Sequence, residues 1–357
     1  MKEMKSNKST KPIKVLVVDD SPMMCKAIEQ ILIADDEIGS ITKALNGQEA
    51  LKALSTQKYD VCTLDVHMPG MNGLTVLKNI MIKYPLPTLM VSAFTAEGSK
   101  VTFEALRFGA VDFFKKPTRN GDGDLIEQAH ILRAKLKRAS RVQVEAARYL
   151  RVKPKASIAK SEGSSLHKFK GISILYGSTG CYSSLLSILP HLNDSLKTPV
   201  IIAMDSSREN ILAFIDYLKS YCIFPLKLAD KIEKLQSRTI YFIPEGYAAY
   251  FDKNADYWEM TVEKRPIETE GEGAIDLTLL SASEVFGEAL LLVVVSGDNQ
   301  YGLTGTKEVL RNNGTILVQA PRGCLAPSTP QIFLDKFNTT SLEPYKISQK
   351  ICEWGND

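Results

Sequence analysis

Short runs of apolar and β-branched residues alternate with amphipathic stretches along the N-terminal part of the chain, and this alternation most constrains its fold. Five consecutive βα units predict a doubly wound parallel sheet. In such a sheet ligands bind beyond the carboxyl ends of the strands, so the residues that follow each run are the candidates for chemistry. The five runs are IKVLVV, SITKAL, DVCTL, PTLMVS and VDFF.

A second alternating region follows a basic and polar segment. The pattern is helical and increasingly basic from Asp124 to about Leu150, and the next stretch has the small, polar and Pro-containing composition of a linker. Beyond the linker, the alternation predicts a second α/β domain, and the stretch from Thr239 to Val262 resembles a hairpin with antiparallel strands. The apolar runs of this region are GISILYG, PVIIAM, SRTIYFIP, ALLLVVVSG and GTILVQA.

The fold class that we expect is therefore α/β, with two doubly wound domains. A chain of 357 residues is too long for one ordinary hydrophobic core. The first domain is expected to hold a five-stranded parallel sheet, and the second a mostly parallel sheet with a hairpin section. The expected divisions are a disordered tail (1–12), a first domain (13–125), a basic helix and linker (126–170) and a second domain (171–350).

The charge of the chain is unevenly distributed. Residues 131–170 contain twelve Lys or Arg against two Glu, a local balance of +10, so the rest of the chain carries −7 within a net charge of +3. A solvated helix and linker explain such a run, and binding to nucleic acid or to an acidic protein surface is the alternative. No helix-turn-helix pattern accompanies the run, so nucleic acid is not an expected partner.

The chain has no sequence signal for export or for a membrane span. Its N-terminus is charged and polar without an apolar core, and no stretch reaches the apolar length of a transmembrane helix. The six cysteines occur singly, without the paired spacing of a zinc site or a redox motif. We therefore expect a cytoplasmic protein with free thiols.

Polar and charged residues gather at the ends of the first domain's predicted strands. Asp19 and Asp20 follow the first strand, Asp65 ends the third, Ser92 ends the fourth and Lys116 follows the fifth. Three carboxylates on one rim repel one another unless a hard cation is present, and oxygen-only ligands favour Mg²⁺. Phosphoryl transfer to a carboxylate needs positioning and charge neutralisation, which Mg²⁺, an ammonium and a hydroxyl would supply.

Together with DVHMPGMNG after the third strand, this pattern resembles the receiver domain of bacterial response regulators over roughly residues 13 to 125. The resemblance implies that Asp65 is the phosphoacceptor. It also implies that Asp19 and Asp20 bind Mg²⁺ with Asp65, and that the backbone carbonyl of His67 is a further ligand.

The same resemblance assigns roles to three more residues. Ser92 and Lys116 match the phosphoryl-sensing hydroxyl and lysine of the family, and Phe113 matches its switch aromatic. It further implies that a sensor histidine kinase phosphorylates the chain.

Ser178 is the candidate nucleophile of the second domain. It lies in YGSTG, between an apolar strand and a helical stretch, where adjacent helix N–H groups are able to hold an oxyanion. A helix N-cap is the alternative for a serine at this junction.

The wider pattern of this region resembles the effector domain of chemotaxis protein-glutamate methylesterases over about residues 171 to 335. Those enzymes also carry an N-terminal receiver. The resemblance implies hydrolysis of glutamyl methyl esters on chemoreceptor cytoplasmic domains, and often deamidation of glutamines, by a Ser, His, Asp triad with Ser178 as nucleophile. It also implies a receiver–effector interface within the chain. The matching segments are GSTG, PVIIAM, YFIPEGYAAYF, AIDLTLLSASEVFGEALLLVVVSG, GTILVQAP and STPQ.

Two members of that triad are missing. Met204 stands at the position matched to the histidine, and Tyr301 at the position matched to the aspartate. Loss of the histidine alone lowers turnover about a millionfold in a serine protease, so we expect Ser178 to be vestigial. Asp205 and Asp298 lie near the expected rim, but an ordinary carboxylate is a poor base for a serine proton.

Two functions follow. In the first, Asp65 phosphorylation in a chemotaxis-type two-component pathway controls a degenerate methylesterase-like domain that acts by binding. In the alternative, the chain is an active protein-glutamate methylesterase and glutamine deamidase that acts on chemoreceptors through Ser178.

Overall fold

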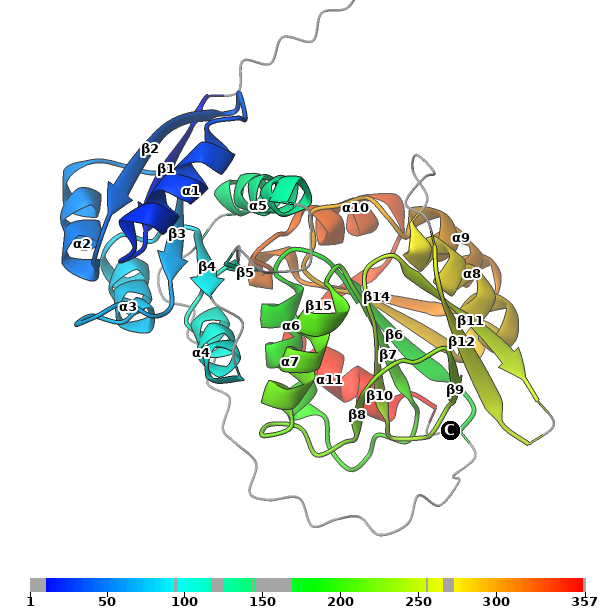
Figure 1. The fold of residues 1–357 in the computed structure, drawn as a ribbon. Helices are drawn as coiled ribbons and strands as arrows, with labels where there is room; N and C mark the ends of the chain where they lie inside the picture. The colour runs from blue at the N-terminus through cyan, green and yellow to red at the C-terminus, as the bar shows by residue number, and fades with distance from the viewer. Residues whose placement is uncertain are drawn as a thin grey trace, which may run out of the picture. The chain divides into compact units, whose positions relative to one another are not determined.

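The computed structural model describes residues 11–92, 96–116, 125–142, 144, 169–254, 256–265 and 273–355. The chain divides into two compact units, Met1–Tyr149 and Leu150–Asp357, and each contains its own parallel sheet (Figure 1). Most of the predicted N-terminal tail and most of the predicted linker lie outside the described residues.

The N-terminal unit is a five-stranded parallel sheet in the order β2-β1-β3-β4-β5. The prediction of five βα units is confirmed, because each predicted apolar run overlaps one strand of this sheet. Strands β3 and β4 are buried along their whole length, as expected for strands that helices cover on both faces. The elements are β1 (Ile13–Val18), α1 (Pro22–Leu32), β2 (Ile38–Ala44), α2 (Gly47–Thr56), β3 (Val61–Asp65), α3 (Gly73–Lys83), β4 (Thr88–Ser92), α4 (Ala96–Arg107), β5 (Asp112–Lys115) and α5 (Leu125–Ser140).

Helix α5 is shorter than the sequence pattern suggested. The expectation of a helix to about Leu150 was wrong, since α5 ends at Ser140. The Ser140 hydroxyl donates to the carbonyl of Lys137 at 2.8 Å, a local bond that competes with the helical ladder. The β-branched Val142 and Val144 then follow outside the helix.

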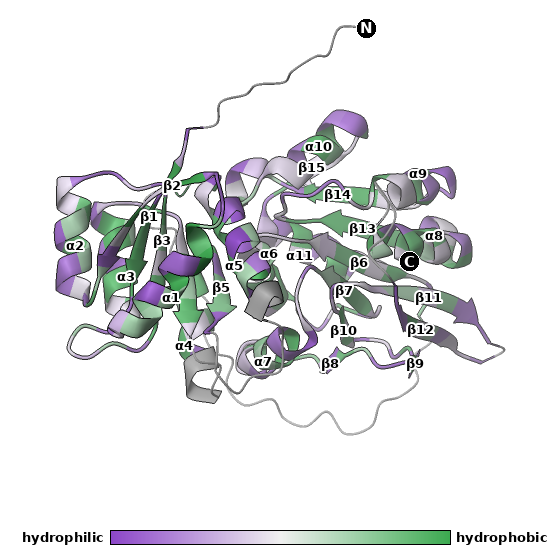
Figure 2. Ribbon diagram, turned by 45° about the horizontal axis from the view of Figure 1, so that its top comes forward, coloured by the Kyte–Doolittle hydropathy of each residue, from purple (hydrophilic) through white to green (hydrophobic). Residues whose placement is uncertain are grey.

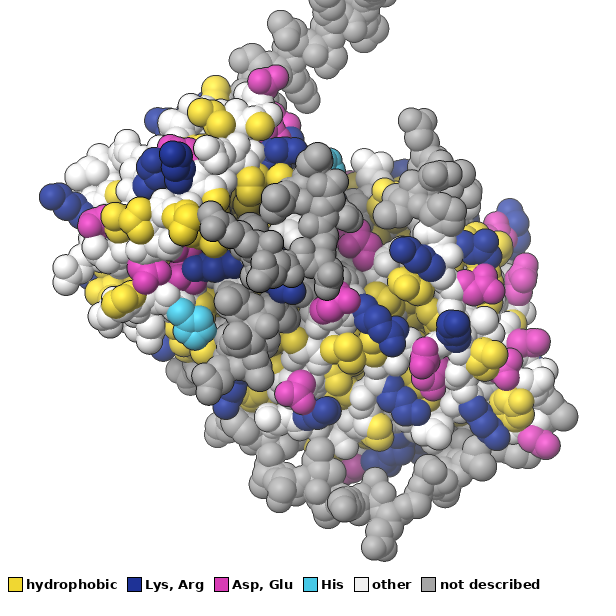
Figure 3. Space-filling view, viewed as in Figure 1, with side chains coloured by type: hydrophobic (Ala, Val, Ile, Leu, Met, Phe, Trp, Pro, Cys, Tyr) yellow, Lys and Arg dark blue, Asp and Glu magenta, His cyan; other side chains and the backbone are white. Residues whose placement is uncertain are grey.

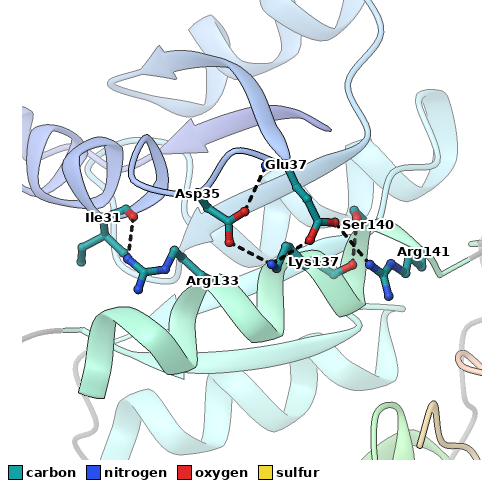
Figure 4. Close-up of polar contacts among 7 residues, drawn as sticks. All are labelled: Ile31, Asp35, Glu37, Arg133, Lys137, Ser140 and Arg141. Atoms are coloured by element: carbon teal, nitrogen blue, oxygen red, sulfur yellow. Dashed lines mark hydrogen bonds and ion pairs between the residues drawn. The ribbon is translucent and has the colours of Figure 1, made fainter. Parts of the chain in front are cut away.

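Basic side chains of α5 contact acidic side chains of the same unit (Figure 4). Lys137 Nζ lies 2.9 Å from both Asp35 Oδ2 and Glu37 Oε1, and Arg141 contacts Glu37 Oε2 at 3.4 Å. These contacts bind the C-terminal half of α5 to the connection between α1 and β2. They raise the pKa of Lys137, chiefly through its hydrogen bonds with Asp35 and Glu37. Part of the basic run is therefore paired within its own domain.

The C-terminal unit contains a seven-stranded parallel sheet in the order β15-β14-β13-β6-β7-β10-β8 and a three-stranded antiparallel sheet in the order β11-β12-β9. The elements are β6 (Ile172–Gly177), α6 (Cys181–Ile188), η1 (Leu189–His191), β7 (Val200–Met204), α7 (Arg208–Leu218), β8 (Leu226–Leu228), β9 (Ile232–Lys234), β10 (Ile240–Ile243), β11 (Tyr247–Lys253), β12 (Trp258–Lys264), α8 (Ala274–Phe286), η2 (Gly287–Ala289), β13 (Leu290–Val294), α9 (Leu303–Arg311), β14 (Thr315–Gln319), η3 (Pro321–Gly323), α10 (Ser328–Lys336), β15 (Thr340–Leu342) and α11 (Pro344–Glu353).

The expected hairpin is present, but it begins later than the sequence suggested. Strands β11 and β12 pair antiparallel from Tyr247↔Lys264 to Lys253↔Trp258. The preceding strand β10 belongs to the large sheet instead, where it pairs parallel with β7 and β8. All four residues of β10 are buried, and their apolar side chains place the strand inside the large sheet.

Hydrophobic residues concentrate in the strands, whereas the helices carry mixed surfaces (Figure 2). In the C-terminal unit, the core lies between the large sheet, α8 and the antiparallel sheet, and it includes Tyr241, Leu279, Phe286 and Met260. On the face drawn in Figure 3, basic and acidic side chains of this unit are interspersed rather than gathered by sign. Among the described residues, no helix is long and apolar enough to cross a lipid bilayer.

Asp276 connects α8 to α9. Its carboxylate is 4% exposed and accepts the N–H groups of Gly273, Gly302 and Gly305, each at 2.9 Å. One side chain thus caps the N-termini of two helices. A Cβ at position 305 would lie 2.7 Å from the carbonyl oxygen of Asp276, so glycine permits the close approach of α9. The loop that precedes α9 is therefore anchored at its end.

We expect Asp276→Ala to lower the free energy of unfolding of the C-terminal unit by about 3 kcal/mol, because three N–H groups, two of them buried, lose their acceptor. Asp276→Asn keeps one acceptor oxygen and is expected to lose about half as much. Urea unfolding followed by tryptophan fluorescence measures this unit alone, because both tryptophans, Trp258 and Trp354, belong to it. The matched control is Asp335→Ala on the exposed face of α10; equal midpoints for the two alanine variants would contradict the prediction.

Candidate functional site

Three acidic side chains meet at the carboxyl end of the receiver-like sheet. Oxygens of Asp19, Asp20 and Asp65 lie within 4.8 Å of one another. Strands β1 and β3 pair in parallel with Val18 opposite Leu64, so the next residues of both strands, Asp19 and Asp65, come side by side. Both are 1% exposed, while Asp20 is exposed. The sequence prediction that strand ends bring these acids together agrees with this geometry.

Lys116 lies between the two buried carboxylates. Its Nζ is 2.7 Å from Asp19 Oδ2 and 2.8 Å from Asp65 Oδ2. Apart from this ammonium, the described residues offer those two oxygens no hydrogen-bond donor. The three carboxylates and one ammonium leave a net charge of −2, which a divalent cation with oxygen ligands would balance. The residues present therefore fit Mg²⁺.

The charges of this cluster shift the pKa values of its members. Burial raises the pKa of Asp65 above its usual value, and the negative charge of Asp19 acts in the same direction against the influence of Lys116. Burial alone would lower the pKa of Lys116, but its contacts with Asp19 and Asp65 outweigh burial and raise it. Lys116 is thus firmly charged, and the ionised Asp65 is in an environment that favours a bound cation or proton.

The other predicted receiver residues surround this cluster. Ser92 is 1% exposed at the end of β4, and its carbonyl accepts the N–H of Lys116 at 2.9 Å. The His67 side chain is exposed, and its backbone N–H donates to Asp65 Oδ1 at 3.2 Å. Phe113 is buried in β5, and β4 lies between β5 and the strand β3 that carries Asp65. One further residue, Gly73, allows α3 to start against Asp65, because a Cβ there would lie 2.0 Å from the Asp65 carbonyl oxygen.

Ser178 occupies the turn after β6 in the C-terminal unit. Its Oγ donates to Asp298 Oδ1 at 3.2 Å and accepts the backbone N–H of Asp298 at 3.1 Å. The alternative that Ser178 caps the following helix was wrong. The N-cap of α6 is Gly180, at φ 78°, and no side chain bonds to that helix end. The serine side chain is therefore directed to the loop after β13 rather than to α6.

The residues at the end of β7 differ in their exposure. Met204 is 4% exposed, and its strand position pairs with Gly177. Asp205 follows it, is partly exposed, and donates its N–H to the carbonyl of Gly177 at 3.3 Å. Burial raises the pKa of Cys181 and Tyr176, and the negative charge of Asp205 adds to both shifts. Asp205, rather than the side chain of Met204, therefore supplies charge next to the Ser178 turn.

Hydrogen bonds hold the loop that carries Asp298 and Tyr301. Asn299 is central: its Oδ1 accepts the Tyr176 hydroxyl at 2.6 Å, and its carbonyl accepts the Thr329 hydroxyl at 2.6 Å. Tyr301 is 39% exposed, and its N–H donates to Asn299 Oδ1 at 3.4 Å. The sequence analysis missed the roles of Asn299 and Tyr176. The sequence feature that could have indicated these two residues is their position, at or just beyond the ends of buried strands.

No imidazole contacts Ser178 in the described part of the chain. His191 lies in η1, beyond the far end of α6, and its Nδ1 is 3.0 Å from the carbonyl oxygen of Ser187. His67 and His130 belong to the N-terminal unit, and His167 lies outside the described residues. Within the described residues, the groups around Ser178 are hydrogen-bonding groups and carboxylates rather than an imidazole.

Comparisons with known proteins match both units. Residues 15–129 match the response regulator receiver domain, and residues 173–351 match the CheB methylesterase. The chain is 30% identical over 328 residues to the protein-glutamate methylesterase/protein-glutamine glutaminase of Pyrococcus horikoshii, with 90% of this chain and 88% of that relative covered. The chain is also 31% identical over 342 residues to protein-glutamate methylesterase/protein-glutamine glutaminase 3 of Vibrio cholerae, with 91% of this chain and 91% of that relative covered.

Two solved structures from Thermotoga maritima resemble one unit each. The response regulator domain of CheB is 42% identical, covers 37% of this chain and 99% of its own, and gives a TM-score of 0.33. The CheB methylesterase catalytic domain is 21% identical, covers 51% of this chain and 97% of its own, and gives a TM-score of 0.48. With a receiver domain followed by a CheB methylesterase domain, the chain belongs to the protein-glutamate methylesterase/protein-glutamine glutaminase family.

Proposed function

We propose that the chain is a phospho-accepting response regulator of a chemotaxis-type pathway, in which Asp65 phosphorylation controls a degenerate methylesterase domain that acts by binding. The observation that carries this proposal is the contrast between the two sites. The receiver cluster combines three carboxylates with an ammonium, the protein groups that Mg²⁺-assisted phosphoryl acceptance uses, whereas Ser178 contacts a carboxylate where the triad of the family has an imidazole.

In the receiver, a carboxylate oxygen of Asp65 would attack phosphorus, and the bond from phosphorus to the donor's leaving group would break. Asp19, Asp20, Asp65 and the backbone carbonyl of His67 would hold Mg²⁺, which when bound neutralises charge on the phosphoryl oxygens. Lys116 already contacts Asp65 at 2.8 Å, so its ammonium is placed to pair with the new phosphoryl group.

The Ser92 hydroxyl is the proposed sensor of that group. Ser92 and Lys116 are joined through their backbones, so a movement of one is transmitted to the other. The proposed donor is a sensor histidine kinase, and the proposed targets are chemoreceptor cytoplasmic domains in the cytoplasm. An interface between the receiver and the effector within the chain would make target binding depend on phosphorylation, provided that the two states differ in affinity.

Binding rather than hydrolysis is proposed for the effector because, among the described residues, Ser178 contacts a carboxylate and no imidazole. Asp298 contacts the serine through both its carboxylate and its backbone N–H. An ordinary carboxylate is a weak base toward a hydroxyl, and loss of the histidine of such a triad lowers turnover about a millionfold. The preserved turn, the anchored loop and the carboxylates instead present a surface of fixed hydrogen-bonding groups.

The alternative is an active methylesterase or glutamine deamidase that uses Ser178. One contact favours it: the backbone N–H of Asp298 donates to Ser178 Oγ at 3.1 Å and would stabilise negative charge that develops on this oxygen. Membership in the family favours it as well. Asp205 or Asp298 would then have to accept the serine proton.

Asp65→Asn is expected to abolish phosphorylation by a small phosphodonor such as acetyl phosphate in the presence of Mg²⁺. Intact-protein mass spectrometry measures the added phosphoryl group. Asp36→Asn, which changes an exposed acid of the same domain, is the matched control and is expected to label like the wild type. Failure of the wild-type chain to accept the label, or unchanged labelling of Asp65→Asn, would remove the basis of the proposal.

The raised pKa of Asp65 predicts a pH dependence of receiver stability. Because the folded-state pKa exceeds the unfolded one, the stabilising contribution of protonated Asp65 is present below the unfolded pKa and is lost as pH rises through the folded pKa. As pH rises above about 4, the ordinary pKa of an aspartate, the free energy of unfolding in EDTA should thus fall more steeply in the wild type than in Asp65→Asn. Urea unfolding followed by circular dichroism measures this free energy. Identical slopes of the free energy against pH in the wild type and in Asp65→Asn would contradict the prediction.

We expect no Ser178-dependent release of methanol from methylated chemoreceptor membranes, with or without acetyl phosphate and Mg²⁺. The expected turnover is about a millionfold below that of a family member with a complete triad, assayed in parallel. The wild type and Ser178→Ala should release methanol at the same background rate. Methanol release that disappears in Ser178→Ala would establish the alternative function instead.

A further inference from the structure

A second basic contact of α5 lies against β5. The Nζ atom of Lys135 is 2.5 Å from Asp112 Oδ2 and 5.7 Å from the centre of the Phe113 ring. The Lys135 and Asp112 side chains are 22% and 16% exposed, so both charges are partly shielded from solvent. An ammonium within about 6 Å of a ring centre is attracted by the π-electrons of the ring face.

The Phe113 ring is enclosed from two sides. Phe103 of α4 meets it edge-on, with ring centres 5.4 Å apart and an angle of 82° between the planes. Phe103 is fully buried, and Phe113 is 1% exposed. Edge-to-face contact of this kind adds to the stabilisation that burial provides. The Phe113 ring therefore contacts both Phe103 of α4 and the Lys135 ammonium of α5.

Asp112 fixes the position of the cation. Its Oδ1 accepts the N–H of Phe113 at 2.7 Å, while its Oδ2 pairs with Lys135. The Asp112 carboxylate thus bonds to the backbone of Phe113 and also to the Lys135 ammonium that contacts the Phe113 ring. Charge-assisted contacts are shorter and stronger than neutral ones, so the ion pair restrains the long lysine side chain. We call Lys135, Asp112 and Phe113 the β5 latch.

The β5 latch is connected to the phosphoacceptor cluster along one strand. Phe113 pairs with Met90 of β4, and Lys116 follows three residues later with its N–H bonded to the carbonyl of Ser92. Phe113 and Lys116 therefore belong to one short segment that is bonded to β4 at both positions.

We infer that the Lys135–Asp112 ion pair holds Phe113 in its buried orientation, and that Lys135 is thereby a positioning residue for the ring through which the receiver responds to Asp65 phosphorylation. The second part rests on the proposed function. The first part does not, because it concerns the balance between buried and exposed orientations of the ring in the chain without a phosphodonor.

The test uses the full-length chain labelled with 4-fluorophenylalanine and observed by ¹⁹F NMR. The chain contains 13 phenylalanines, and Phe113→Leu identifies the resonance of interest. Lys135→Met removes the charge and keeps the length of the side chain. It is expected to raise the ratio of exposed to buried Phe113 about two- to five-fold, as loss of a cation–π contact implies. Lys135→Arg keeps the cation and is expected to restore the wild-type ratio.

Lys137→Met is the matched control. Lys137 lies on the same helix with a similarly exposed side chain, 25% against 22%, but it pairs with Asp35 and Glu37 rather than with β5. Its loss is expected to lower receiver stability without changing the Phe113 ratio. A Phe113 resonance unchanged in Lys135→Met would overturn the inference, and so would the same change in Lys137→Met, because general loosening of α5 would then explain it.

A second arm adds acetyl phosphate and Mg²⁺ and measures label on Asp65 by mass spectrometry in the same samples. In the wild type, phosphorylation is expected to shift the Phe113 resonance, and in Lys135→Met the exposed-to-buried ratio should remain two- to five-fold above the wild-type value. Absence of label in the wild type would refute the proposed function while leaving the donor-free comparison valid. Label without any shift of Phe113 would refute the link between the ring and Asp65.

Discussion

The contact of one ammonium with two buried carboxylates governs the chemistry of the receiver. Lys116 bridges Asp19 and Asp65, yet the cluster with Asp20 still has two more negative charges than positive ones. Burial of like charges destabilises a fold unless counter-ions are supplied, and Lys116 supplies only part of that compensation. The destabilising excess of negative charge and the fit of the cluster to a divalent cation therefore have the same physical origin.

The effector site has the opposite character. Ser178 Oγ is hydrogen-bonded to both the carboxylate and the backbone N–H of one residue, Asp298. A hydroxyl that is already bonded on both sides has little tendency to lose its proton without a stronger base. The chain thus joins a cluster with an excess of negative charge to a serine whose hydroxyl is already hydrogen-bonded.

The sequence predicted what depends on strand order and missed what depends on side-chain contacts between distant segments. Asp19, Asp65 and Ser92 were placed correctly because the ends of parallel strands share one edge. The end of α5 and the capping of α9 by Asp276 were not predictable. A serine bonded to its own helix, and one carboxylate shared by two helix ends, leave no periodic signal. Likewise Lys137 meets Asp35 about a hundred positions away, and only the fold brings them together.

The anchoring of the loop before α9 bears on how such a family diversifies. Asp276 anchors one end of the loop by accepting the N–H of Gly302. Asn299 anchors its centre through hydrogen bonds with Tyr176 and Thr329. None of these bonds uses the outward side chain of Tyr301. A different side chain at position 301 would thus leave the backbone path of this loop intact, so the residue there is able to vary without loss of the loop's shape.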